Sequence, residues 1–115
     1  MAADRNVDPL ETMLELIAHL ERRTKPLSLA QFEADQDEVD LAAFRVGHIG
    51  EEGRKLSADI RDRYPEVEWK RMVQMRNVIA HSYGTIIAPL IWNVVQTELD
   101  PIKRLCQIEL ERLLK

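Results

Sequence analysis

Apolar residues recur every three to four positions along most of the chain, which is the spacing of one face of an α-helix. The stripe nearest the start of the sequence is the clearest, and Asp8 can cap a helix there whose first turn holds Pro9. The apolar members of this stripe are Leu10, Met13, Leu14, Ile17 and Leu20. No segment has the alternating pattern of a strand, so the sequence predicts an all-α fold.

Further helical segments follow the first one, and a connector at residues 63–66 separates the third from the fourth. Pro101 interrupts the last segment, and its ring meets the carbonyl of Thr97, so we expect a kink or a split there. The expected ranges are 28–34, 37–57, 69–83 and 89–114.

Three glycines lie inside the third helical segment, at Gly47, Gly50 and Gly53. Each costs about 1 kcal/mol relative to alanine in a helix interior. Their presence indicates that another backbone approaches closely, either at a dimer seam or at a tight crossing within the chain.

The length of 115 residues is that of one ordinary domain, so a single domain over residues 1–115 is predicted. With neither a signal peptide nor an apolar run long enough for a bilayer, we expect a cytoplasmic protein with no membrane partner. Cys106 is the only cysteine, which excludes an intramolecular disulfide and Cys-based zinc sites. No metal-ligand spacing or phosphate-binding loop is present, so no metal and no cofactor are expected.

Residues 75–84 read Met-Arg-Asn-Val-Ile-Ala-His-Ser-Tyr-Gly, a combination of polar groups that few structural helices need. The guanidinium of Arg76 can hold two oxygens of a phosphate, and the imidazole of His81 can move a proton near neutral pH. Together they suit metal-independent cleavage of RNA, in which the 2′-hydroxyl of the substrate attacks the adjacent phosphate. We predict Arg76 and His81 as the catalytic pair, with Asn77 and Ser82 as supporting groups.

Helix geometry restricts this prediction, because Arg76 and His81 point about 140° apart on a continuous helix. Either the helix deforms before His81, or two copies of the motif face each other across a dimer; the dimer is favoured. The alternative is purely structural, with Arg76 paired to a carboxylate, His81 at a helix end and Tyr83 packed with its hydroxyl in solvent.

The charge pattern bears on nucleic-acid binding. A net charge of −4 argues mildly against a sequence-independent binder. Residues 1–53 contain five basic and twelve acidic side chains, whereas residues 54–76 contain seven basic and four acidic ones. Any positive field therefore lies beside Arg76, unless these charges only solvate helix faces. The seven are Arg54, Lys55, Arg61, Arg63, Lys70, Arg71 and Arg76.

Beyond the string Arg-x-x-x-x-His-x-Tyr, several flanking strings resemble the HepT-type toxins of the all-helical HEPN superfamily. They cover nearly all of the chain, most firmly residues 49–95. The strings are Ile49-Gly50-Glu51, Lys55-Leu56-Ser57, Arg63-Tyr64-Pro65-Glu66, Trp69, Met75-Arg76-Asn77 and Ile91-Trp92-Asn93-Val94-Val95.

The resemblance implies an up-and-down bundle of four to five helices that forms a homodimer, with the two motifs facing a shared cleft. It implies an endoribonuclease toxin with RNA as substrate, paired with a minimal nucleotidyltransferase antitoxin. In some such systems the antitoxin attaches AMP to the tyrosine of the motif, which is Tyr83 here.

The chain also departs from this pattern. Relatives commonly carry an arginine and a glutamate where this chain has Phe44 and Gly47, and acidic residues where it has residues 84–88. The altered residues of the third helix, together with the acidic net charge, favour the alternative of a non-catalytic nucleotide-binding or adaptor subunit of a nucleotidyltransferase complex. A helical dimer without a ligand is a third reading.

Overall fold

The chain is all-helical in the part that the computed structural model describes, which is residues 4–80 and 88–115. The predicted fold class is confirmed, although these ranges contain seven helices and not four to five. None of the described helices is long and apolar enough to cross a membrane. The helices are α1 (Val7–Thr24), α2 (Leu29–Ala34), α3 (Gln36–Arg54), α4 (Ala58–Arg63), α5 (Trp69–Ala80), α6 (Ala88–Thr97) and α7 (Leu99–Leu113).

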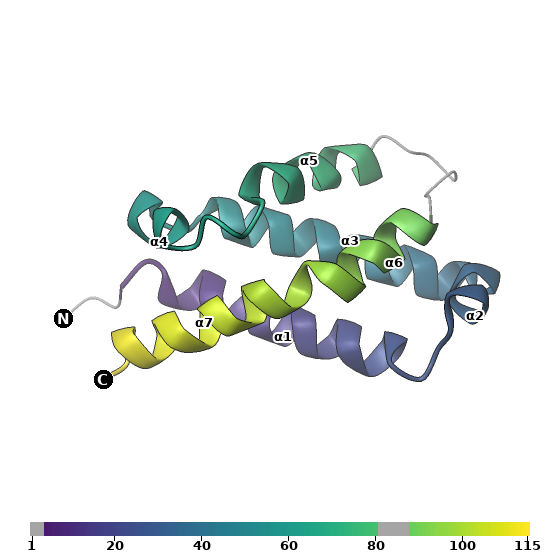
Figure 1. The fold of residues 1–115 in the computed structure, drawn as a ribbon, viewed down its shortest axis with the longest axis horizontal. Coiled ribbons are helices and arrows are strands. Elements are labelled where there is room, and N and C mark those ends of the chain that lie inside the picture. Colours follow the sequence, from purple (N-terminus) through teal and green to yellow (C-terminus); the bar gives the residue numbers. More distant parts are fainter. Residues whose placement is uncertain (1–3, 81–87) are drawn as a thin grey trace.

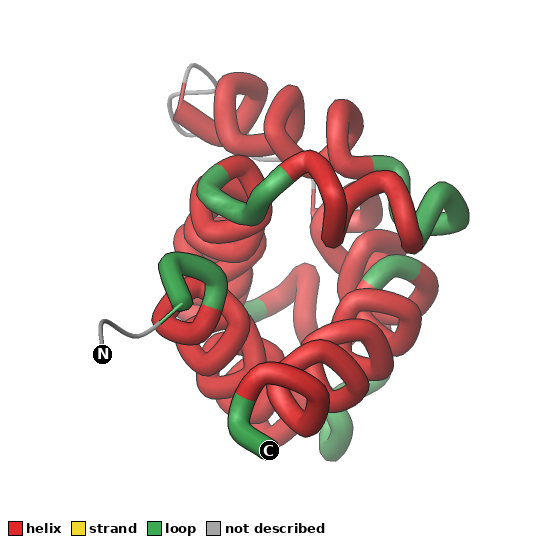
Figure 2. The backbone as a smooth tube through the Cα atoms, turned by 90° about the vertical axis from the view of Figure 1, so that its left-hand side faces the viewer, coloured by secondary structure: helices red, strands yellow, loops and turns green. Residues whose placement is uncertain are grey.

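The helices form an elongated bundle with extents of 48 × 28 × 25 Å. Helix α3 is central, because it packs against α1 on one side and against α5 on the other, and also contacts α2 and α6. Helix α7 packs along α1, so the start of α1 and the end of α7 lie at the same end of the bundle (Figure 1). Figure 1 shows α5 alongside α3 at the edge of the bundle, and the end-on view in Figure 2 shows the helices arranged around its long axis.

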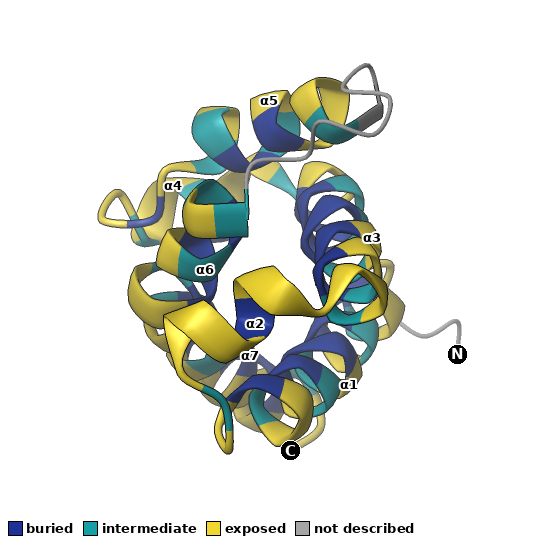
Figure 3. Ribbon diagram, turned by 90° about the vertical axis from the view of Figure 1, so that its right-hand side faces the viewer, coloured by how far each residue is buried: buried dark blue, intermediate teal, exposed yellow. Residues whose placement is uncertain are grey.

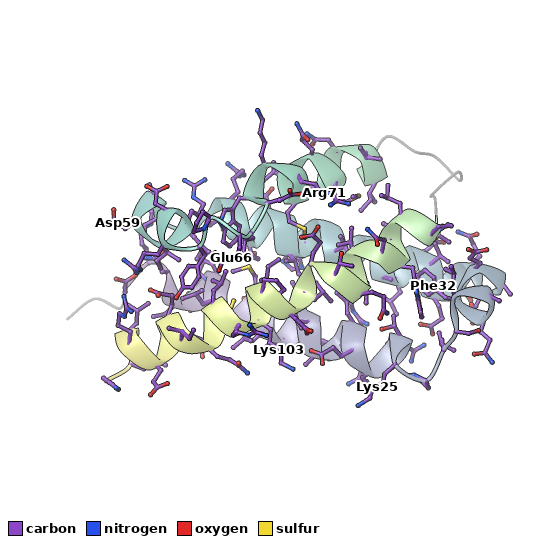
Figure 4. The ribbon with its side chains drawn as sticks, in the orientation of Figure 1. Lys25, Phe32, Asp59, Glu66, Arg71 and Lys103 are labelled. Atoms are coloured by element: carbon purple, nitrogen blue, oxygen red, sulfur yellow. The ribbon has the colours of Figure 1, made fainter. Side chains whose placement is uncertain are left out.

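Apolar side chains on the inward faces of the helices form one core (Figure 3). The short helix α2 closes one end of it with Phe32, which is fully buried and whose ring centroid lies 5.2 Å from that of Trp92 (Figure 4 labels Phe32). Burying a side chain of this size stabilises the fold by about 1.5–3 kcal/mol. The largest fully buried side chains are Phe32, Leu10, Met13, Ile17, Leu20, Ile49, Leu56, Met72, Ile91, Leu99, Ile102 and Leu105.

Helix α2 begins as predicted, with a reciprocal cap in which Ser28 accepts from the Gln31 amide and Gln31 accepts from the Ser28 amide. Helix α1 differs from prediction, since it begins at Val7 and Asp8 lies in its first turn. The residue before that helix, Asn6, is buried and accepts a 2.8 Å hydrogen bond from the Ser57 amide. A long-range contact thus replaces the expected local cap.

The last predicted helix is split, as the proline in its middle indicated. Helix α6 ends at Thr97 and α7 begins at Leu99, so Pro101 lies in the first turn of a new helix, where the missing N–H costs nothing. Glu98 at this joint accepts a 2.8 Å hydrogen bond from Arg71 of α5 (Figure 4). The joint is therefore tied to the helix that carries the candidate site.

Helix α4 was not predicted, because its six residues follow the expected third helix, which ends at residue 57, and run into the connector at residues 63–66. A buried carboxylate of α7 holds the end of α4 in place. Glu109 has no exposed side-chain surface and accepts hydrogen bonds from Arg63 at 2.5 Å and from the Tyr64 hydroxyl at 2.6 Å. Burial raises the pKa of Tyr64 to about 12, and its hydrogen bond to Glu109 acts in the same direction.

The three glycines of α3 line its crossing with α5, and the two helices run antiparallel there. A Cβ atom added at Gly50 would lie 2.5 Å from the carbonyl oxygen of Met72, and one at Gly53 would lie 2.9 Å from the Trp69 ring. At Gly47 the nearest atom would be the Cα of Arg76, at 3.8 Å. The close approach inferred from the sequence is therefore a crossing within the chain.

Candidate active site

Arg76 lies on the outer flank of α5, one turn before the end of the helix. Its side chain is 54% exposed. The residues of α5 that are buried against α3 are Met72 and Met75. The absence of a side chain at Gly47 leaves room for the Cβ and Cγ atoms of Arg76 against the backbone of α3. The helix crossing thus fixes the base of this side chain and leaves its guanidinium at the surface.

The guanidinium of Arg76 faces a carboxylate on the neighbouring helix. Its Nε atom lies 3.4 Å from an oxygen of Glu51, and the other oxygen of Glu51 accepts a 2.6 Å hydrogen bond from Arg54. The hydrogen bond from Arg54 lowers the pKa of Glu51, and the charges of Arg54 and Arg76 lower it further. Glu51 therefore stays ionised and holds two arginines at one place on the surface.

A shallow groove of about 390 Å³ adjoins Arg76 and separates the outer edges of α3 and α5. Its wall on α3 includes Phe44, which is 67% exposed, and His48, whose ring meets that of Phe44 edge-on at 6.0 Å between centroids. The Nε2 atom of His48 lies 3.3 Å from Glu52. The groove is lined by Ala43, Phe44, Gly47, His48, Glu51, Arg76 and Ile79. It thus combines an apolar surface with one cation, one carboxylate and one imidazole.

The predicted site is only partly visible in the described residues. Asn77 follows Arg76 on α5 and is exposed, so both are available to a ligand. The other three predicted residues, His81, Ser82 and Tyr83, lie outside the described residues, as does the predicted helix end at Gly84. The proposed roles of these three residues remain predictions.

Three neighbours of Arg76 were not predicted as site residues. Glu51 belongs to a string that carried the family resemblance, but no role was predicted for it. His48 was not singled out, and Phe44 was noted only as a departure from the family pattern. Their spacing was a usable signal, because residues 44, 48 and 51 repeat at four and three positions and so share one face of α3.

The described residues offer little for other chemistries. No three His, Cys, Asp or Glu side chains in residues 4–80 and 88–115 are placed to hold a metal ion. Burial raises the pKa of the Cys106 thiol to about 12, so this side chain stays protonated and has no role as a nucleophile.

Comparison with known proteins identifies the family. Residues 13–108 match the family described as "Ribonuclease HepT-like". The chain is 38% identical over 60 residues to MJ1380 of Methanocaldococcus jannaschii, which is named as a candidate RNase; the match covers 52% of this chain and 55% of that protein. It is 25% identical over 96 residues to the probable ribonuclease HepT of Thermococcus cleftensis, covering 84% of this chain and 87% of the relative.

No solved structure matches the chain significantly. The family model nevertheless spans α5, the groove and all but the first turns of α1, so the described site lies within the matched region. The resemblance drawn from the motif and its flanking strings is confirmed, and the chain belongs to the HepT-like ribonuclease family.

Proposed function

We propose that this protein is a metal-independent endoribonuclease toxin in which Arg76 and His81 form the catalytic pair. The observation that carries the proposal is the placement of Arg76, exposed on α5 beside a groove, in a chain of the HepT-like ribonuclease family. Asn77 and Ser82 are proposed as supporting contacts to the substrate.

The proposed reaction uses only the substrate and these side chains. A neutral His81 imidazole takes the proton of the 2′-hydroxyl as that oxygen attacks the adjacent phosphorus. The bond from phosphorus to the 5′-oxygen then breaks. A protonated imidazole then gives its proton to the leaving 5′-oxygen, which leaves a 2′,3′-cyclic phosphate and a 5′-hydroxyl. Arg76 offsets the charge that develops on the phosphoryl oxygens. To bind the phosphate, the Arg76 guanidinium gives up its contact with Glu51, in which Nε lies 3.4 Å from a carboxylate oxygen.

We further propose that the active form is a homodimer with the two Arg76 groove surfaces facing each other. The divergence of Arg76 and His81 on a continuous helix supports this arrangement, because a second copy can supply the partner side chain. The apolar wall of the groove also supports it, since Phe44 in that wall is 67% exposed.

The proposed regulator is a minimal nucleotidyltransferase antitoxin. It transfers AMP from ATP to the hydroxyl oxygen of Tyr83 with release of pyrophosphate, and the added volume and negative charge block the RNA site beside Arg76. Intact-mass measurement after incubation with the partner and ATP tests this step. An unchanged mass, or an addition that persists in Tyr83→Phe, rejects it.

Growth of a bacterial host during induction of the chain alone tests the catalytic proposal. Arrest by the wild type that Arg76→Ala and His81→Ala both relieve at equal expression supports a motif-dependent toxin. The second candidate, a non-catalytic adaptor of a nucleotidyltransferase, is favoured by the apolar Phe44 and Gly47 in the groove. Absence of arrest, with purified wild type and His81→Ala equally inert on RNA, would select the adaptor.

A further inference from the structure

A second surface pocket lies between the end of α3, helix α4 and the start of α5. Arg54 lines it, and Glu51 links Arg54 to Arg76. The pocket has a volume of about 340 Å³ and is lined by three cationic side chains and no carboxylate. The ring of Trp69 lies against Gly53 at its floor, where an added Cβ atom would come within 2.9 Å of the ring. The lining residues are Gly53, Arg54, Arg61, Trp69, Lys70 and Val73. We call this the α4–α5 pocket.

Two hydrogen-bond donors of this pocket lack acceptors. The Nε atom of Arg61 and the indole Nε1 of Trp69 are both covered from solvent, and neither has a hydrogen-bond partner among the described residues. A buried donor without an acceptor costs about 1–3 kcal/mol, so native proteins seldom leave one without a reason. Because both atoms are covered, an acceptor oxygen reaches them only when the side chain turns towards the pocket, and the two unmet donors mark a place that a bound anion would stabilise.

The cations of the pocket are also less neutralised than their neighbours. Neither Arg61 nor Lys70 forms an ion pair within residues 4–80 and 88–115, whereas Arg71, one residue further along α5, contacts both Glu98 and Glu68. Arg54 is the one cation of the pocket that has a carboxylate partner, Glu51. The pocket therefore carries net positive charge in a protein whose formal net charge is −4.

The position of the pocket relative to Arg76 suggests its ligand. Glu51 contacts both Arg54, at the edge of the pocket, and Arg76. Lys70 and Arg76 are six residues apart on α5, which is about 9 Å along the helix axis. The two side chains also point about 120° apart around α5, so a strand held at Arg76 must cross the surface of this helix to place a second phosphate at Lys70. A larger groove of about 960 Å³ shares Arg61, Trp69 and Lys70 with the pocket. Its lining also includes Arg71 and the carboxylates of Asp62 and Glu68.

We propose that the α4–α5 pocket binds a backbone phosphate of the RNA strand that is cleaved at Arg76. Arg61 and Lys70 supply the charge, and Trp69 supplies a neutral donor. This inference rests on the proposed ribonuclease function, and it adds a substrate-positioning site that fixes the strand at a point away from the scissile bond.

Binding of a 2′-O-methyl RNA oligonucleotide to the full chain, followed by fluorescence anisotropy across a salt series, tests the proposal without any cleavage. The slope of log Kd against log salt changes by about 0.7 for each phosphate contact that a single strand loses. Lys70→Gln should therefore weaken the salt dependence by about 0.7, and Arg61→Gln with Lys70→Gln by about 1.4. Lys70→Arg should restore the wild-type slope.

Arg104→Gln is the matched control, because it removes one exposed positive charge from α7, which packs on α1 and not on α5. An equal slope in the wild type, Lys70→Gln and Arg104→Gln overturns the proposal. Lys70 is exposed, so its replacement leaves the fold intact even if Arg61→Gln does not.

The same variants are tested with inorganic phosphate and with AMP as competitors. Site variants that lose these small anions but keep oligonucleotide binding would assign the pocket to a free phosphate compound and reject the RNA assignment. Oligonucleotide binding that depends on Lys70 in a protein that fails to cleave RNA would leave the pocket standing and reject the catalytic function alone.

Discussion

Replacement of Gly50 by alanine tests whether backbone contact between α3 and α5 sets the position of the candidate site. The new Cβ atom would lie 2.5 Å from the carbonyl oxygen of Met72 and 3.0 Å from its carbon. Neither backbone atom can move without its helix, so α5 must shift outward. Overpacking of this kind costs about 1–3 kcal/mol, and a rigid backbone neighbour places Gly50→Ala at the upper end of that range. Alanine returns about 1 kcal/mol of helix propensity, so we expect a net loss of about 2 kcal/mol.

Gly47→Ala is the matched control on the same helix. Its Cβ atom would meet Arg76 at 3.8 Å, which is an ordinary contact, so only the gain in helix propensity of about 1 kcal/mol remains. The two alanine variants should therefore differ by about 3 kcal/mol in the free energy of unfolding. Urea denaturation followed by circular dichroism at one protein concentration measures this difference. Equal stabilities, or a Gly50→Ala variant more stable than the wild type, would refute the glycine-crossing argument.

Three further predictions concern carboxylates and the groove. Burial alone raises the pKa of Glu109, but the hydrogen bonds from Arg63 and Tyr64 outweigh it and hold this pKa below its ordinary value of 4.5. The ionised Glu109 therefore stabilises the fold above pH 4.5, and this stabilisation is lost as the pH falls through the lowered folded-state pKa. The urea midpoint of Glu109→Gln should be lower than that of the wild type at neutral pH. It should also change less with pH across this acidic range. Glu51→Gln removes a negative charge beside Arg76. The repulsion between that charge and a bound RNA phosphate is about 0.7 kcal/mol at a separation of about 6 Å in a water-like dielectric. The variant should therefore bind 2′-O-methyl RNA about 3-fold more tightly, and unchanged or weaker binding would contradict this reasoning. Phe44→Glu places a charge on the proposed dimer face, so sedimentation should show more monomer at a given concentration, and an unaltered distribution would place the interface elsewhere.

Much of the fold could be predicted because it depends on local patterns. The apolar stripe of α1, the Ser28 cap of α2 and the break near Pro101 are all properties of neighbouring residues. Helix α4 could not be predicted in this way. Its six residues contribute only Ile60 to the core, and its end is held by Glu109, which lies 46 positions from Arg63 in the sequence.

The candidate site was predictable in its residue types but not in its surroundings. Arg76 was selected for its chemistry, but its contact with Glu51 of α3 depends on how the two helices pack. A helix-wheel argument divides α5 by residue type, whereas the actual buried face is set by the glycines of α3. Because these glycines bring the backbones of α3 and α5 together at Met72, Arg76 lies at the side of this contact and opposite Glu51.

The glycine crossing also bears on how this surface can change. Most helix pairs are kept apart by interlocking side chains. A substitution at the contact therefore alters both the distance between the helices and their relative position along their axes. At Gly50 the distance between α3 and α5 is set by contact with the peptide backbone of Met72, whose atoms are the same whatever side chain that position carries. The outer residues of the groove, such as Phe44 and His48, can therefore be exchanged for others while α5 keeps its place. Such a scaffold allows new ligand preferences to arise by single substitutions, without a repacking of the bundle.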